Sequence, residues 1–305
     1  MSTTPITASN YLPGATAIRH CRLCMNSGAL AVLLDSGDSR LLKCAHCGVT
    51  MLDPAPTEAE LAAHFVDHYI TDDERLEKTF EKTREVILAQ VARNVLHRKE
   101  GGNILDIGCA GGYFLNRFFS RLGWTRYGLE PSRYATHKAE EKGIRMYQGQ
   151  VLSVDLPAGH FDVVTAMDVF CYFRDPQLEL RAIHKAMKPD GLLLIELPLA
   201  ETQLLRNTGR TALLAGGPGR LLTKCGHLFF FNRSSMEFLL ERTGFHVEAF
   251  LPVPANRQGH FYKDMAFRTY FLASRLLWYL SARKFMLGPN FLVVASLKSN
   301  ISNHG

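Results

Sequence analysis

Several absences limit what this 305-residue chain can be. It has no window of about 18 uncharged apolar residues, and the first twenty residues contain no apolar core of the signal-peptide type. We therefore expect a soluble, cytoplasmic protein. The seven cysteines do not indicate disulfides, because four fall into a metal-binding pattern and the other three are scattered. A hydrophobic content of 47% is enough for one large domain and one small one.

The glycine spacing typical of nicotinamide cofactors is also missing. Ile104, Leu105 and Ile107, around the single acid Asp106, predict a buried strand at 103–107, and the small residues at 108–112 predict a tight turn before a helix. Counting from Gly108, the third position is Ala110 and the sixth is Tyr113, where the dinucleotide fingerprint requires glycine. What stands instead is an acid followed by a small residue at every second position, namely Asp106, Gly108, Ala110 and Gly112. An acid at the strand end favours a ligand with a cationic ammonium over one with a pyrophosphate.

This acid and glycine pattern resembles the first motif of the class I S-adenosylmethionine (SAM)-dependent methyltransferases. Further motifs follow in the family's order, with strands expected at 126–129, 143–147, 161–166 and 192–197. The resemblance implies an α/β fold with a Rossmann-like, seven-stranded sheet. Its sixth and seventh strands, which form an antiparallel edge in the family, are expected at 246–251 and 291–297.

The same resemblance implies which residues bind SAM. Glu130, at the end of the second strand, is expected to accept hydrogen bonds from both ribose hydroxyls. Gln150 stands where the family commonly has an acid that reaches the exocyclic amine of adenine, and its carbonyl can accept the same bond. The full expected set is Asp106, Gly108, Ala110, Gly112, Glu130, Gln150, Val151, Met167 and Asp168.

Two CxxC pairs near the N-terminus predict a zinc site. Nineteen residues separate the pairs, and short strands are expected between them at 30–34 and 40–43. Four thiolates fill a tetrahedral shell, so the site is closed and structural, a staple for a small module, although nucleic-acid or partner binding is the alternative. The predicted ligands are Cys21, Cys24, Cys44 and Cys47.

The chain is expected to have three parts. Residues 1–53 form the zinc ribbon, and 54–100 form a linker and a helical segment. The pairs Thr57 with Glu60 and Thr71 with Glu74 are capping boxes, the second opening a helix that runs to about residue 97 beside the cofactor edge of the sheet. The charged face of that helix is expected to be solvated. Residues 101–305 form the SAM-binding domain.

Two segments, at 199–226 and 255–288, are insertions that do not belong to the minimal seven-stranded fold, and the first is expected to be a lid. Residues 202–226 contain four cations and no acid, and the second insertion contains six cations and one acid. This charge suggests a small anionic substrate such as a nucleotide sugar, with a solvated basic face as the alternative. The apolar helix expected at 269–282 could pack over the pocket, against a second subunit in a homodimer, or against a membrane surface.

Two residues are candidates for catalysis. Because the methyl group of a sulfonium is already electrophilic, the enzyme must align a nucleophile and remove its proton. His227 lies in a run, residues 226–231, that resembles a segment of zinc-ribbon methyltransferases, among them deoxysugar C-methyltransferases, where a histidine is implicated as base. Tyr172 could donate a hydrogen bond to the acceptor or orient it. Without the resemblance, packing or capping is the commoner role for a lone histidine, and core packing is the commoner role for Tyr172.

The sequence therefore predicts methyl transfer from SAM to an oxygen or carbon of a small metabolite. One alternative is RNA methylation, in which the ribbon and the basic insertions would grip phosphates. It is disfavoured because the Asn/Asp-Pro-Pro-Tyr/Phe signature of many amino-nitrogen methylases is missing after the fourth strand. A second alternative is a SAM-binding scaffold without chemistry.

Overall fold

The computed structural model describes residues 20–28, 30–57, 59–61, 63, 74–208, 221–222, 226–257, 259–283 and 286–298. Most of the predicted lid, including Arg210, Arg220 and Lys224, lies outside these ranges, as does the capping residue Thr71. Within the described ranges, no helix combines the length and the apolar character needed to cross a membrane.

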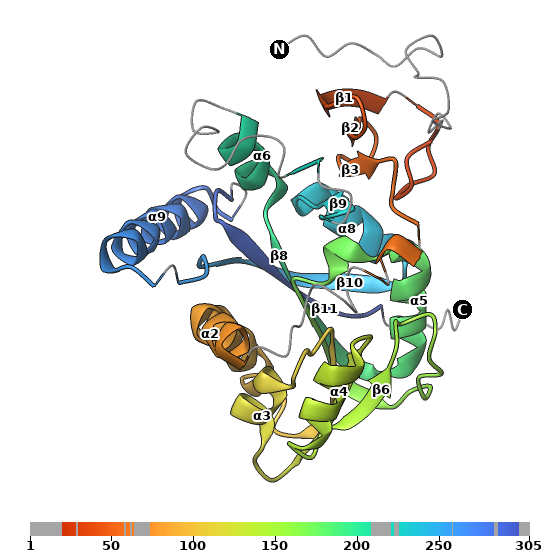
Figure 1. The fold of residues 1–305 in the computed structure, drawn as a ribbon, viewed down its shortest axis with the longest axis vertical. Helices are drawn as coiled ribbons and strands as arrows, with labels where there is room; N and C mark the ends of the chain where they lie inside the picture. The colour runs from red at the N-terminus through yellow and green to blue at the C-terminus, as the bar shows by residue number, and fades with distance from the viewer. Residues whose placement is uncertain are drawn as a thin grey trace, which may run out of the picture.

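A seven-stranded sheet forms the centre of the molecule (Figure 1). Its order is β10-β11-β8-β7-β4-β5-β6, and the strands from β8 to β6 run parallel. The last two strands in the chain pair antiparallel with each other and with β8, which confirms the expected edge. The strands are β4 (Gly102–Ile107), β5 (Trp124–Glu130), β6 (Arg145–Gln148), β7 (Phe161–Met167), β8 (Met187–Pro198), β10 (Phe245–Val253) and β11 (Asn290–Leu297).

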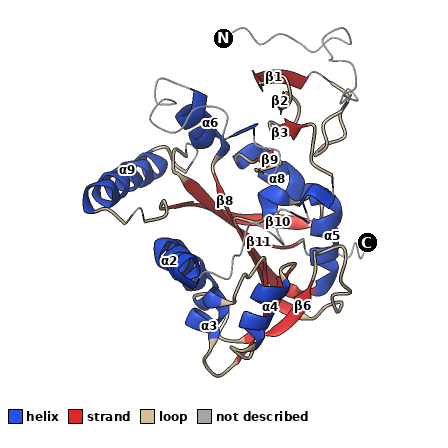
Figure 2. Ribbon diagram, in the orientation of Figure 1, coloured by secondary structure: helices blue, strands red, loops and turns tan. Residues whose placement is uncertain are grey.

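Helices cover both faces of this sheet (Figure 2). Strand β4 shows why two cores form, because successive side chains point to opposite faces. Leu105 and Ile107 join a core that contains apolar residues of α5 and α8, whereas Ile104 joins a core that contains residues of α2, α3 and α4. The helices are α2 (Glu74–Leu96), α3 (Tyr113–Phe119), α4 (Arg133–Glu140), α5 (Pro176–Ala186), α6 (Ala200–Thr208), α8 (Arg233–Arg242) and α9 (Phe261–Leu280).

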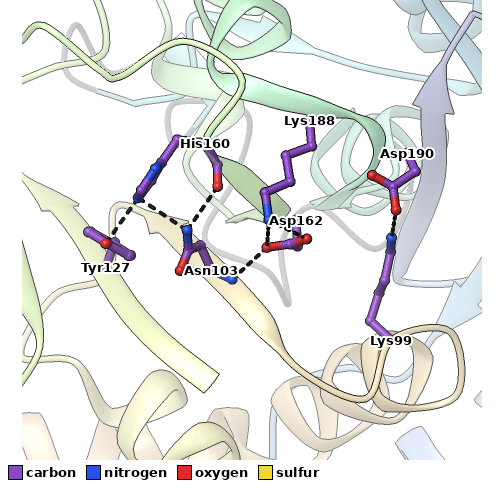
Figure 3. A network of polar contacts seen from close by, with 7 residues as sticks. All are labelled: Lys99, Asn103, Tyr127, His160, Asp162, Lys188 and Asp190. Atoms are coloured by element: carbon purple, nitrogen blue, oxygen red, sulfur yellow. Dashed lines mark hydrogen bonds and ion pairs between the residues drawn. The ribbon is translucent and has the colours of Figure 1, made fainter. Parts of the chain in front are cut away.

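Polar contacts tie together the amino ends of the parallel strands (Figure 3). Asp162 of β7 accepts a hydrogen bond from the backbone N–H of Asn103 in β4 at 2.7 Å. It also forms an ion pair with Lys188 of β8, with the charged atoms 2.7 Å apart. His160 lies 3.0 Å from the hydroxyl of Tyr127 in β5. These contacts hold neighbouring strands together at their amino ends. The opposite edge, where the carboxyl ends lie, is the usual ligand-binding edge of such a sheet.

The N-terminal module is a second, four-stranded sheet, seen at the top of Figure 1 beside α8. The expected strands are present as β1 (Leu30–Asp35) and β2 (Arg40–Cys44), and β3 (Thr50–Asp53) follows. The fourth strand, β9 (Phe229–Phe230), comes from the segment just before α8 and pairs antiparallel with β3. This pairing could not be predicted from the sequence, because a strand of two residues has no measurable periodicity.

Candidate active site

An open cleft lies at the carboxyl edge of the parallel strands, with an empty volume of about 1210 Å³. Eight of the nine residues predicted to bind the cofactor line it, and Gly112 does not. A Cβ at Gly112, where φ is 76°, would lie 2.4 Å from the Cδ1 of Ile144. That glycine therefore allows the turn to pack closely against its neighbours.

The turn after β4 brings backbone to the floor of the cleft. Gly108 has φ of 69° and Ala110 has φ of 47°, both in the left-handed region. A Cβ at Gly108 would lie 2.8 Å from Val169 Cγ2, so the space above this residue is already filled. The N–H of Ala110 donates to the Glu130 carboxylate at 3.1 Å, which fixes the turn to the end of β5.

Asp106 and Glu130 are buried carboxyls at the ends of neighbouring strands. Burial raises the pKa of Asp106 to about 7, even though Thr165 donates a 2.7 Å hydrogen bond to its carboxylate. Burial also raises the pKa of Glu130, against hydrogen bonds from the backbone N–H groups of Ser132 and Ala110. A cation entering this part of the cleft would stabilise the charged form of both acids.

Arg84 of α2 reaches into the carboxyl edge and pairs with two more acids. Its guanidinium lies 2.8 Å from Asp168 Oδ2 and 2.8 Å from Glu196 Oε2. Both the arginine and the glutamate are buried, and burial raises the pKa of Glu196 to about 7. The prediction that the charged face of this helix is solvated is therefore wrong at Arg84, because the acids below it need a counter-charge.

Asp168 has a left-handed backbone conformation and one carboxylate oxygen without a hydrogen bond. It adopts φ of 58°, which is uncommon for a residue other than glycine, and its Oδ1 is buried without a hydrogen-bond partner. That oxygen lies 4.0 Å from Nε2 of His227. Arg84 thus holds one carboxylate oxygen of Asp168 and leaves the other directed toward the histidine.

His227 and Tyr172 come together from separate segments of the chain. Their rings meet edge to face, with centroids 5.2 Å apart, and Nδ1 of the histidine lies 3.4 Å from the amide nitrogen of Gln203 in α6. Tyr172 lines the cleft, whereas His227 lies behind Tyr172 and Asp168 and is not among the lining residues. Burial lowers the pKa of His227, although the charge of Asp168 acts in the opposite direction. The imidazole is therefore neutral near pH 7.

Positioning of His227 depends on the ribbon. The backbone of Leu228 donates to the carbonyl of Cys171 at 2.9 Å and accepts from the N–H of Leu52 at 3.0 Å. Phe229, next along β9, is fully buried beneath the Arg22 guanidinium of the ribbon at 4.8 Å. The residue after the histidine is thus hydrogen-bonded to the cleft wall on one side and to the ribbon on the other.

The four ribbon cysteines form a cluster that could bind zinc. Their sulfurs lie within 4.8 Å of one another, with Cys21 and Cys47 3.7 Å apart and Cys24 and Cys44 also 3.7 Å apart. A tetrahedral zinc with Zn–S distances of about 2.3 Å places its sulfurs about 3.8 Å apart. The donor set and its spacing therefore fit one ion.

Several residues in or next to the cleft were not anticipated from the sequence. Arg84 and Glu196 gave no signal, because a charged residue in a helix and an acid in an apolar strand both look like surface positions until they are placed in the fold. Arg174 and Glu179 also line the cleft, and burial raises the pKa of Glu179 to about 8. None of the described cations of the two insertions lines the cleft.

Comparison with known proteins agrees with this architecture. A model of the "Methyltransferase domain" family matches residues 79–249, more than half of the chain. The fold is shared with a chain of the Haloferax volcanii complex between the Trm112 methyltransferase activator and a methyltransferase (TM-score 0.54, 16% identity, covering 78% of this chain and 97% of that one). A SAM-dependent methyltransferase from Mesorhizobium loti gives a TM-score of 0.50 at 18% identity, covering 68% and 96%.

The fold and the position of the cleft are those of a methyltransferase domain. The chain belongs to the methyltransferase domain family. Curated relatives include a ubiquinone biosynthesis O-methyltransferase of Caulobacter sp. (strain K31), 38% identical over 122 residues that cover 37% of this chain and 48% of that protein. Another is the methyltransferase YdaC of Bacillus subtilis, 28% identical over 109 residues, covering 34% and 60%. The chain spans about half the length of the curated relatives it matches.

Replacing Arg84 with methionine should show how much this cation stabilises the protein by compensating the buried acids. The loss of the cation leaves Glu196 charged and unpaired, so we expect the unfolding free energy to fall by about 3 to 5 kcal/mol at pH 8. Burial already raises the pKa of Glu196 to about 7, and loss of Arg84 removes an interaction that lowers it. The folded variant therefore binds a proton at Glu196 more readily as the pH falls, and the penalty should be smaller at pH 6 than at pH 8. Urea unfolding at both pH values measures this.

The matched control is Arg117→Met. Arg117 is 56% exposed and lies 3.5 Å from Glu85, so its loss should change stability by less than about 1 kcal/mol. Equal effects of the two substitutions would show that Arg84 does not compensate buried charge.

Proposed function

We propose that this protein transfers a methyl group from SAM to an oxygen of a small metabolite, with His227 as general base. The observation that carries the proposal is the concentration of acids at the open cleft, beside a turn with backbone exposed to it. A desolvated, negatively charged site favours a ligand that carries positive charge. SAM, when bound, supplies a sulfonium methyl that is already electrophilic.

Asp106 and Glu130 would hold the two ends of the polar part of the cofactor. Glu130 already accepts backbone hydrogen bonds on each of its oxygens, from Ala110 and Ser132, which fixes the orientation of its carboxylate. We assign to it the ribose hydroxyls and to Asp106 the ammonium group. Gln150 and Val151, at the other side of the cleft, would contact the adenine.

At the acceptor end, we propose that Asp168 and His227 act together. The amide nitrogen of Gln203 is a donor, so a contact with Nδ1 favours the tautomer with its proton on Nε2, facing Asp168 Oδ1. On acceptor binding, Nδ1 would exchange the Gln203 amide for the acceptor hydroxyl and take its proton, and the Asp168 carboxylate would stabilise the imidazolium that forms. Tyr172, which lines the cleft and packs against the His227 ring, would orient the acceptor.

The nature of the acceptor is a separate proposal. An oxygen acceptor is supported by the O-methyltransferases among the curated relatives. A negative charge on the acceptor would be met by Arg174, the cation that lines the cleft beside Tyr172 and Phe173. The four ribbon cysteines would hold one structural zinc ion, which would keep β3 in position to pair with β9.

Glu130→Gln and Asp106→Asn should each weaken SAM binding without unfolding the protein. Loss of hydrogen bonds to a charged acceptor costs about 1.5 to 3 kcal/mol, or roughly 10- to 150-fold in affinity. In the unchanged protein the affinity should rise from pH 6 to pH 8, because SAM binds the ionised form of a carboxyl whose pKa is about 7. Asp106→Asn should flatten that dependence.

Calorimetry with SAM at both pH values tests this, with Asp155→Asn as the control, since Asp155 is exposed and does not line the cleft. Undiminished SAM affinity in both cleft variants would contradict the assignment.

His227→Ala should retain SAM affinity and lose turnover. Removal of a general base lowers the rate by about 10² to 10⁴-fold. S-adenosylhomocysteine release is measured with a panel of hydroxylated aromatic compounds and sugar nucleotides, and the rate should be level above pH 7 because the pKa of His227 is lowered. The exposed His246 supplies the control His246→Ala. A His227→Ala enzyme with normal turnover would remove this residue from the mechanism.

Zinc content distinguishes ligand cysteines from the others. We expect one zinc per chain by elemental analysis, and its loss in Cys44→Ser together with a lower unfolding temperature, because the ribbon has few other means of holding its strands together. Cys109→Ser should retain the zinc, since Cys109 lies in the turn after β4. Zinc-free wild-type protein with unchanged stability would contradict a structural ion.

A further inference from the structure

Helix α9 has an apolar face that the rest of the described chain leaves uncovered. In Figure 1 it stands out from the body of the molecule, at the left. Only Ser274 and Trp278 of its twenty residues are buried. Large apolar side chains are exposed along its whole length: Phe261 71%, Tyr262 85%, Met265 47%, Leu272 54%, Leu276 60%, Tyr279 52% and Leu280 76%.

These exposed side chains form one continuous face. With 3.6 residues per turn, residues 261, 262, 265, 266, 269, 272, 273, 276, 277, 279 and 280 occupy an arc of about 160° that contains no charge. The buried Ser274 and Trp278 lie on the opposite arc, which packs toward β10 and α2. The helix is therefore apolar on the side that faces away from the protein, the reverse of an ordinary surface helix.

Charges border this face and are mainly positive. Arg268 and Arg275 fall on one border and Lys263 on the other, and Asp264 is the one acid in the helix. Long basic side chains at the borders of an apolar face can extend to anionic headgroups while their stems cover apolar surface. Such a border complements a negatively charged surface.

We propose that α9 binds the surface of an anionic lipid bilayer, lying in the plane of the interface. The helix does not cross the membrane, since it is not apolar enough to do so. Its outer face would be buried at the boundary between headgroups and acyl chains, with Arg268 and Lys263 at the phosphates. Tyr262 near one end and Tyr279 near the other carry both an apolar ring and a polar hydroxyl, which suits this depth.

A second copy of this chain is a poorer occupant for the same face. Two α9 helices packed through their apolar faces would bring three cations from each helix together, with one acid from each, Asp264, to match them. Like charges brought together in this way destabilise the pair. A bilayer with anionic headgroups covers the same apolar area and neutralises the borders. The proposal is independent of the proposed methyl transfer, because α9 lines no part of the cleft.

Sedimentation with vesicles tests the proposal on the full, zinc-loaded chain. We expect binding to phosphatidylglycerol vesicles, much weaker binding to phosphatidylcholine vesicles, and a loss of binding as salt is raised. The double variant Leu272→Glu with Leu276→Glu should bind at least about tenfold more weakly, because it places charge in the apolar arc. Arg268→Gln should lower the affinity about fivefold.

Leu122→Glu is the matched control, since Leu122 is fully exposed and lies between α3 and β5, away from α9. It should bind vesicles as the unchanged protein does. SAM affinity and unfolding temperature, unaltered in all the variants, establish that they are folded.

Three results would overturn the proposal. The first is absence of binding to phosphatidylglycerol, and the second is equal binding by the double variant. The third is a dimer in light scattering that the double variant converts to a monomer, because the face would then be an interface between copies of the chain.

Discussion

Four carboxylates at the ends of adjacent parallel strands are the feature on which the site depends. Asp106 ends β4, Glu130 ends β5, Asp168 follows β7 and Glu196 lies near the end of β8. Parallel strands place their carboxyl ends at one edge, so acids separated by ninety residues of sequence become neighbours. Burial makes their mutual repulsion expensive. The protein offsets this in part with Arg84 and in part by the raised pKa values of three of them.

This arrangement leaves the two sides of the cleft with different counter-charges. Arg84 is committed to Asp168 and Glu196, on the β7 and β8 side of the edge. On the β4 and β5 side, Asp106 and Glu130 have hydrogen-bond donors that are neutral, the hydroxyl of Thr165 and backbone N–H groups. The site is therefore divided into a half that carries its own counter-charge and a half in which a ligand can supply it.

The ribbon takes part in building the cleft wall near His227. β9 is a strand of the ribbon sheet, and it begins two residues after His227 in the chain. Leu228 is bonded both to Cys171 beside the cleft and to Leu52 of the ribbon, so the position of the histidine depends on both. A zinc ion that stiffens β2 and β3 would thereby also stiffen this part of the cleft wall, although the ion would take no part in the chemistry.

The sequence by itself determined the fold class, the seven strands, the turn after β4 and the set of cysteines. These features depend on local patterns, in which apolar periodicity, glycine positions and short spacings are all visible along the chain. Eight of the nine residues expected around the cofactor line the cleft, because strand order carries them there. Only the tertiary structure decided that Arg84 is buried between two acids, that β9 completes the ribbon, and that α9 turns its apolar side outward. Each of these depends on contacts between residues far apart in sequence, whose burial and charge environment no local pattern encodes.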